Sequence, residues 1–133
     1  MWVARLFAFA FLFCIASLAN AQTPRKVALV IGNSDYANAA PLTNPVNDAR
    51  LVESALRQAG FSTVETATNL GIHPFQSALR EFAARARGAD IALIYFAGHG
   101  METDGQNWLI PTDAKLASDT DLRFEAIRLE DVL

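Results

Sequence analysis

The sequence predicts an α/β fold in which helices cover a mostly parallel sheet. Two apolar runs, Val27–Ile31 and Ile91–Phe96, show no polar alternation, which is typical of strands buried on both faces of such a sheet. Between them lie two segments with apolar residues at helical spacing, separated by a shorter β-branched stretch. This alternation indicates a β-α-β-α-β order. A chain of 133 residues has room for one such domain.

Residues 1–21 differ from the rest of the chain and are interpreted as a secretory signal peptide. An apolar run follows Arg5 and ends in the small-residue sequence Ala-Asn-Ala. A short basic start, a brief apolar stretch and a small-residue end are typical of a leader that is cleaved, here before Gln22. We therefore expect residues 22–133 to be exported, either periplasmic or secreted, with an uncleaved anchor as the alternative.

The composition of residues 22–133 argues against several classes of function. Cys14 is the sole cysteine and lies in the leader, so the mature part has neither a disulfide nor a thiol nucleophile. Loss of Arg5 lowers the basic count from 11 to 10 against 14 acidic residues, which moves the net charge from −3 to −4. This balance favours neither nucleic acid nor a membrane surface as a partner after cleavage of the leader.

The first apolar run ends at Gly32, and a loop and a helix are expected to follow it. The loop, residues 33–41, matches neither phosphate-binding glycine pattern, which disfavours nucleotide binding. Asn44 is the expected N-cap, with Pro45 at the first helical position. Asp48 falls in the first turn, where a carboxylate favours the helix dipole, so a purely structural role accounts for it. The predicted apolar face comprises Ala49, Val52, Leu56 and Ala59, with Gly60 as the stop.

A polar strand and a second helix are predicted next. Phe61–Ala67 is short and β-branched, which indicates a strand near an edge of the sheet. A turn over Asn69–Pro74 leads into the helix, where His73 is interpreted as a surface or capping residue. The predicted buried face of this helix comprises Phe75, Leu79, Phe82, Ala83 and Ala86, and Gly88 ends it.

The second apolar run ends in Gly-His-Gly, which makes His99 the main candidate for a catalytic side chain. Flanking glycines permit a sharp turn and the close approach of another backbone. Open α/β sheets place their sites at the carboxyl ends of the strands, where His99 is expected. A solvent-facing histidine in a hairpin turn is the structural alternative. Beyond a polar segment, Asp104-Gly105 predicts a hairpin turn and Asn107–Ile110 a short strand.

The tail from Ala114 is more polar and ends in an amphipathic pattern. That pattern, formed by Ile127, Leu129, Val132 and Leu133, predicts the start of a helix. Because a helix of one turn has no packed end, we expect the sequence to be truncated. The aspartates at positions 104, 113, 119 and 121 are too scattered to predict a calcium site, so no cofactor is expected.

Four segments in order resemble the caspase-like cysteine peptidases and are most similar to the bacterial metacaspase-like branch. They are RKVALVIGNSDY, LTNPVNDA, ALIYFAGHG and NWLIPTD, and the resemblance extends from about Arg25 to the end, which is nearly all of the mature chain. The resemblance implies a caspase-like α/β/α sandwich with a mostly parallel sheet, left incomplete because the carboxyl-terminal strands are missing. It also implies a partial peptidase domain over residues 22–133, with a peptide or protein as substrate.

The resemblance implies roles for particular residues. His99 matches the histidine of a Cys-His catalytic dyad, and the backbone N–H of Gly100 matches an oxyanion-hole donor. Asp48 matches an acidic residue in the first specificity pocket, which would favour cleavage after arginine or lysine. The family's cysteine follows its histidine by about 50 residues, which is beyond Leu133.

Three hypotheses follow for the function of the chain. The first is the amino-terminal part of an exported caspase-like cysteine endopeptidase. The second is a cysteine-less pseudo-peptidase that binds peptides or a partner protein, and the third is an unrelated α/β binding module. In the caspase-like sheet that the resemblance implies, the strand that carries the cysteine pairs beside Ile91–Phe96, so its absence should leave this run as an unprotected edge.

Overall fold

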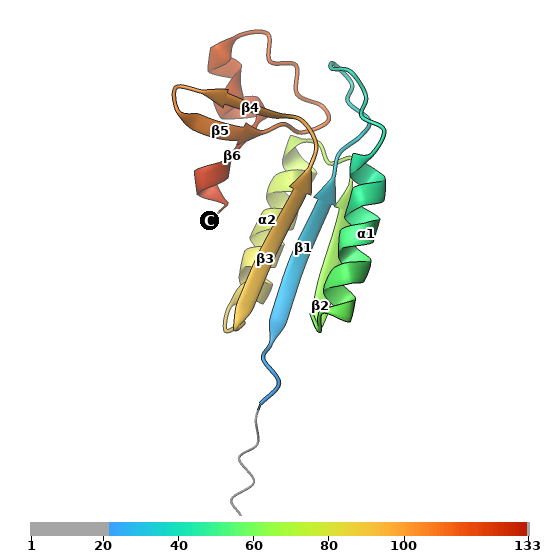
Figure 1. Cartoon of the computed structure of the whole chain (residues 1–133). Helices are drawn as coiled ribbons and strands as arrows, with labels where there is room; N and C mark the ends of the chain where they lie inside the picture. Colours follow the sequence, from blue (N-terminus) through green and yellow to red (C-terminus); the bar gives the residue numbers. More distant parts are fainter. Residues whose placement is uncertain (1–21, 133) are drawn as a thin grey trace, which may run out of the picture.

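The computed structural model describes residues 22–132, so the predicted leader with Cys14 lies outside the described residues. A parallel sheet with strand order β2-β1-β3 forms the centre of the molecule, and two helices cover its opposite faces (Figure 1). These elements are β1 (Lys26–Gly32), α1 (Pro45–Gln58), β2 (Thr63–Thr68), α2 (Ile72–Ala86) and β3 (Ile91–Ala97). The predicted α/β class and the β-α-β-α-β order are confirmed, and β2 lies at an edge as predicted.

β1 is buried on both faces, as its continuous apolar run predicts. Its side chains alternate between the two helices, because successive residues of a strand point to opposite faces. The cluster on the α2 face comprises Val27, Leu29, Ile31, Phe75, Phe82 and Ile127. The cluster on the α1 face comprises Ala28, Val30, Ala49 and Val64. The core of the molecule therefore lies on both sides of this one strand.

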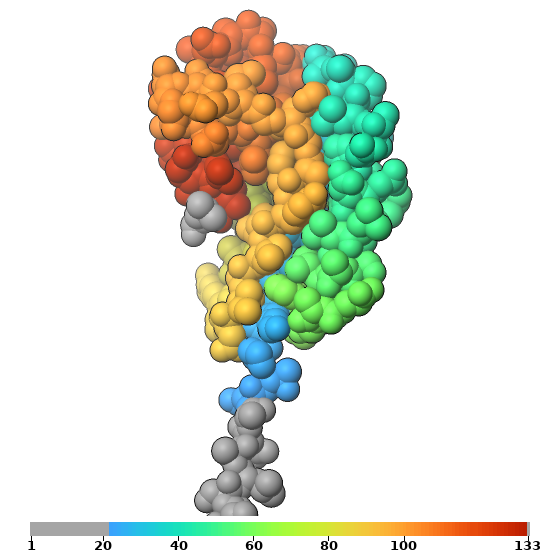
Figure 2. Space-filling view, in the orientation of Figure 1, coloured from blue at the N-terminus to red at the C-terminus, as the bar shows by residue number. Residues whose placement is uncertain are grey.

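β3 is less buried than its apolar sequence predicts. Within residues 22–132 it pairs with β1 alone and so forms the second edge of the sheet. Its residues are half-buried or exposed, and Ile91 keeps 44% of its surface accessible. Figure 2 shows β3 along most of its length at the molecular surface. The expectation of a strand buried on both faces is wrong here, whereas the expected edge position is what the structure has.

The helices differ from the predictions at Asn44, Ala59 and Ala83. α1 begins at Pro45 as predicted, but the Asn44 side chain forms no capping hydrogen bond. Ala59 was predicted on the buried face, but it lies just after the helix and is exposed. Gly60 has the predicted role, because it adopts the left-handed conformation, with φ of +83°, that ends many helices. Ala83 of α2 is also exposed, because it lines a groove beside the β3 edge instead of packing under the sheet.

A second, antiparallel sheet lies beyond the carboxyl end of β3 (Figure 1). Its strands are β4 (Gly100–Thr103), β5 (Gln106–Leu109) and β6 (Ile127–Arg128), in the order β4-β5-β6. Asp104 and Gly105 both have positive φ, 52° and 71°, which confirms the hairpin turn. The interpretation of Ile127 as part of a helix is wrong, because Ile127 pairs with β5 as a strand.

Short helices complete the described chain. They are η1 (Asp119–Asp121), α3 (Leu122–Glu125) and η2 (Leu129–Asp131). Leu122 is buried with Trp108 of β5, so α3 is held against the small sheet. Within residues 22–132, none of the helices combines the length and the apolar character that crossing a membrane requires.

Candidate functional site

His99 lies at the carboxyl end of the parallel sheet, in the short connection between β3 and β4. The loop formed by residues 33–41, which follows β1, passes over it. The Nε2 atom of His99 lies 2.8 Å from the carbonyl oxygen of Ala40. Because a carbonyl oxygen only accepts hydrogen bonds, Nε2 carries the hydrogen in the neutral imidazole. Nδ1 is then the nitrogen with a free lone pair, which can take a proton from a nearby acid.

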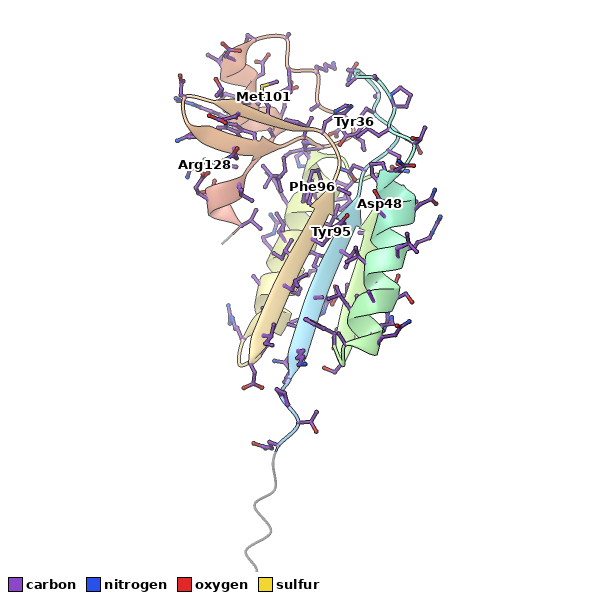
Figure 3. All side chains as sticks on the ribbon, in the orientation of Figure 1. Tyr36, Asp48, Tyr95, Phe96, Met101 and Arg128 are labelled. Atoms are coloured by element: carbon purple, nitrogen blue, oxygen red, sulfur yellow. The ribbon has the colours of Figure 1, made fainter. Side chains whose placement is uncertain are left out.

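Tyr36, in the same loop, holds the backbone beside the imidazole. Its hydroxyl accepts a hydrogen bond from the N–H of His99 at 2.8 Å and donates one to the carbonyl oxygen of Ile110 at 3.1 Å. The two rings meet at an interplanar angle of 61°, with their centroids 4.4 Å apart. Burial raises the pKa of Tyr36 above its ordinary value, so the phenol keeps its proton at neutral pH. Figure 3 shows Tyr36 between this loop and the end of the sheet.

The loop 33–41 is fixed to neighbouring segments at several points. The side-chain oxygen of Asn69, just after β2, accepts the N–H of Ser34 at 2.9 Å. Farther along, the N–H of Ala37 donates to the carbonyl oxygen of Thr112 at 2.8 Å. The carbonyl that faces the imidazole therefore belongs to a loop that is held at Ser34 and at Ala37.

The two glycines that flank His99 have different roles. A Cβ atom at Gly98 would lie 2.5 Å from the Tyr36 hydroxyl and 2.7 Å from the Phe96 ring, so only glycine fits there. A Cβ atom at Gly100 would meet nothing closer than the carbonyl oxygen of Trp108 at 3.5 Å, which is an ordinary contact. The first glycine is thus required by packing, and the second is not.

The N–H of Gly100 points out of the small sheet. Ile110 donates its N–H to the carbonyl oxygen of His99 at 3.0 Å, so these two residues face each other across a hydrogen-bonded pair. In an antiparallel ladder the next pair, here Gly100 with Leu109, is not hydrogen-bonded, and its N–H groups face outward. Within residues 22–132, β4 is an edge strand and Gly100 is exposed, so a backbone donor without a partner among these residues lies directly after His99.

Asp48 lies in the first turn of α1, at the same end of the sheet as His99 (Figure 3). Its residue is half-buried, and its carboxylate forms no hydrogen bond or ion pair with any residue between 22 and 132. The close approach of α1 to β1 depends on Gly32, where a Cβ atom would collide with Pro45 and Ala49. His73, by contrast, is exposed at the start of α2.

In the part of the chain that the structure describes, no three His, Cys, Asp or Glu side chains gather as a metal site. Two of the scattered aspartates hold backbone amides instead. Asp113 accepts the N–H of Ile72 at 2.9 Å, and Asp121 accepts that of Ser118 at 2.8 Å.

The structure therefore places the predicted residues His99, Gly100 and Asp48 at one end of the sheet, while their catalytic and binding roles stay predictions. Sequence reasoning missed Tyr36 and Ala40. The only local signal for Tyr36 was a single aromatic residue in a loop of small and polar residues. Ala40 acts through its carbonyl oxygen, which every residue has, so no residue type could have indicated it.

Comparisons with known proteins identify one matching family and two similar proteins. The family model described as the caspase domain matches residues 25–133. The chain is similar to mucosa-associated lymphoid tissue lymphoma translocation protein 1 of Homo sapiens and to its homolog in Mus musculus, with 35% identity over 89 residues in both cases. Each match covers 67% of this chain, which spans only 11% of the length of these curated relatives.

Proposed function

The chain belongs to the caspase domain family, and from this we propose that it contributes His99, Gly100 and Asp48 to the site of an exported cysteine endopeptidase of the metacaspase-like bacterial branch. The observation that carries the proposal is the oriented imidazole of His99, with a free backbone N–H at the next residue. The substrates would be peptides or proteins cleaved after arginine or lysine. Residues 22–133 contain no cysteine, so the thiol must come from outside these residues.

His99 would act as the base and then as the acid of the reaction. The Ala40 carbonyl binds Nε2–H, which leaves Nδ1 to accept the proton of the thiol. The resulting thiolate would attack the carbonyl carbon of the substrate. The imidazolium would then return its proton to the nitrogen of the departing amine.

The N–H of Gly100 would bind the oxygen of the substrate carbonyl as negative charge develops on it. The outward direction of this N–H at the edge of β4 supports that role. A donor that is fixed before the reaction stabilises the developing charge without reorganisation.

Asp48 would bind the cationic side chain that precedes the cleaved bond. The support is a half-buried carboxylate that has no partner among the described residues and lies at the same end of the sheet as His99. A carboxylate of this kind can bind guanidinium through a charge-assisted, bidentate contact.

A pair of peptides that differ only in charge tests the assignment of Asp48. One carries arginine and the other citrulline, its neutral analogue, and both are titrated into isotope-labelled protein by NMR. We expect the arginine peptide to bind more tightly and to shift the amides of Asp48 and Gly100. In Asp48→Asn this preference should disappear. Equal binding of the two peptides to the unsubstituted protein would contradict the assignment.

Hydrolysis provides the second test, through the need for a thiol. Residues 22–133 alone should not cleave fluorogenic arginine or lysine peptides, because His99 has no thiol to activate. Turnover by purified residues 22–133 that His99→Ala abolishes would refute this expectation. In a protein that also contains the family cysteine, cleavage after arginine should be lost on alkylation and in His99→Ala.

The lack of cysteine in residues 22–133 also supports a second candidate, a pseudo-peptidase that binds peptides without cleaving them. The two candidates make the same prediction for arginine binding and differ in turnover. Protein expressed from its own gene should cleave the bound peptide if the first is correct and release it intact if the second is.

Export is also part of the proposal, and it rests on the leader-like sequence of residues 1–21. Cell fractionation and mass spectrometry of the mature amino terminus would test it. Cleavage before Gln22 is expected, and an intact amino terminus in the cytoplasm would contradict it.

A further inference from the structure

We infer that Tyr36 is a positioning residue, which sets the orientation of His99 and of the Gly100 N–H by inserting its hydroxyl into the last pair of the small sheet. The inference deepens the proposed function and rests on it for its catalytic meaning. The arrangement itself can be tested in the absence of substrate.

The β4–β5 ladder ends in an incomplete pair, His99 with Ile110. In a hydrogen-bonded antiparallel pair, the two residues exchange both N–H···O bonds. Ile110 donates to the carbonyl oxygen of His99 at 3.0 Å, so one of the two bonds is present. In place of the other, the N–H of His99 donates to the Tyr36 hydroxyl at 2.8 Å, and this hydroxyl donates to the Ile110 carbonyl at 3.1 Å.

Only a group that both donates and accepts a hydrogen bond can occupy this place. A hydroxyl donates one hydrogen bond while it accepts another, so it satisfies the N–H of His99 and the carbonyl of Ile110 together. Burial keeps Tyr36 protonated, and the hydroxyl therefore retains the hydrogen that it donates. Phenylalanine would fill the same volume but would leave both backbone groups without this partner.

The Tyr36 hydroxyl affects both groups of the site, the His99 imidazole and the Gly100 N–H. With the His99 N–H bound to Tyr36 on the inner side, the alternation of the strand turns the Gly100 N–H to the outer side. The Tyr36 ring meets the imidazole at a centroid distance of 4.4 Å, which limits tilting away from the Ala40 carbonyl. One side chain thus fixes both the base and the backbone donor.

Gly98 leaves room for this contact. A Cβ atom at Gly98 would lie 2.5 Å from the Tyr36 hydroxyl, closer than any such contact allows. The glycine before His99 is therefore the counterpart of Tyr36, because it admits the hydroxyl to the ladder.

The test compares Tyr36→Phe with Tyr95→Phe in the full chain, at a concentration where sedimentation shows a monomer. Tyr95 is the matched control, because it is the other tyrosine and its hydroxyl forms no hydrogen bond within residues 22–132. The 15N resonances of the imidazoles report the tautomer, and exposed His73 provides the reference for a free ring. In the unsubstituted protein, His99 should be a single Nε2–H tautomer.

In Tyr36→Phe we expect the His99 nitrogens to move towards the averaged shifts of His73. We also expect the Gly100 amide resonance to move, and hydrogen exchange at the His99 N–H to rise roughly tenfold, as for the loss of one hydrogen bond. Tyr95→Phe should change none of these. His99 nitrogen and Gly100 amide shifts that move no more than in Tyr95→Phe would overturn the inference.

A measurement on the unsubstituted protein keeps the inference testable if Tyr36→Phe does not fold. The Tyr36 hydroxyl proton should exchange slowly with water and give a resolved resonance, with a nuclear Overhauser effect to the His99 amide. A hydroxyl proton that exchanges as fast as that of Tyr95 would contradict the inserted geometry. Neither readout involves a peptide, so a failure of arginine binding would reject the proposed function and leave this result unaffected.

Discussion

At the scale of single residues, Gly98 shows how little space surrounds the candidate base. Gly98→Ala would place a methyl group against the Tyr36 hydroxyl and the Phe96 ring, at 2.5 and 2.7 Å. We expect this overpacking to lower the free energy of unfolding by about 1–3 kcal/mol. Gly100→Ala is the control for stability, since its methyl group would meet only ordinary contacts. Equal urea midpoints for the two variants would show that the hydroxyl can move aside.

Asp48 allows stability and recognition to be separated at a single position. If its carboxylate only favours the start of α1, Asp48→Ala should cost roughly 0.3–1 kcal/mol of stability and affect all peptides alike. If it also binds a cation, arginine peptides should lose a further ~2–5 kcal/mol relative to citrulline peptides. Thermal unfolding measures the first quantity and titration the second. Asn47→Ala, in the same turn, serves as the control and should leave the arginine preference intact.

Between elements, Glu53 connects α1 to β2 in a way that depends on pH. Its carboxylate accepts hydrogen bonds from the Thr66 hydroxyl at 2.8 Å and from Arg57 at 2.9 and 3.1 Å. The bond from Thr66, followed by that from Arg57, lowers the pKa of Glu53 below its ordinary 4.5. Stabilisation from a lowered folded-state pKa is present above 4.5 and is lost as the pH falls through the folded-state value.

Glu53→Gln should therefore destabilise the protein at neutral pH, and the difference from the unsubstituted protein should shrink as the pH falls below 4.5. Guanidinium unfolding over a series of pH values measures this. Glu102→Gln is the control, because Glu102 is exposed and its carboxylate forms no hydrogen bond within residues 22–132. A difference that stays constant down to acidic pH would mean that the charge of Glu53 contributes nothing.

The elements of the parallel sheet, the Asp104-Gly105 turn and the strand over Asn107–Ile110 could be predicted from the sequence, whereas the partners of that strand in the small sheet could not. Long, regular apolar patterns predicted β1 and α1, and buried residues of both elements, among them Leu29 and Ala49, belong to these patterns. Gly100–Thr103 and Ile127–Arg128 are too short for a pattern, and they become strands only because both pair with β5. The apolar run of β3 predicted a strand correctly, but burial depends on neighbours that no local sequence specifies.

The candidate site was predictable to a similar degree. His99, Gly100 and Asp48 lie in motifs that could be compared with a family. Tyr36 could not be found in that way, since its hydroxyl binds backbone groups that lie 63 and 74 residues away along the chain. Contacts of side chains with distant backbone leave no periodicity or spacing in a sequence.

At the scale of the whole molecule, the outer edge of β3 is a surface that favours association with other chains. The strand carries no charge and no proline, and residues of α2, of β3 and of the carboxyl-terminal segment line a groove of about 590 Å³. Such edges pair with other chains. We expect residues 22–133 to be poorly soluble and to associate as their concentration rises.

Ala92→Lys tests this, because Ala92 is an exposed residue of β3 and charges at an edge discourage pairing. Sedimentation velocity should show less association in this variant than in Ala59→Lys, which adds the same charge after α1. A monomer at all concentrations, with slow amide exchange in β3, would show that the edge is protected.

The Ala40 carbonyl has a consequence for how this site tolerates genetic change. The imidazole is held by a peptide oxygen, which persists whatever codon occupies position 40, and the Ala40 side chain is exposed. Drift at position 40 should therefore be nearly silent, as long as the loop keeps its path. Tyr36 is the opposite case, because one nucleotide that turns its codon into one for phenylalanine removes the single oxygen on which two backbone groups depend. In a saturation mutagenesis experiment, we expect most substitutions at position 40 to be tolerated and most substitutions at position 36 not to be.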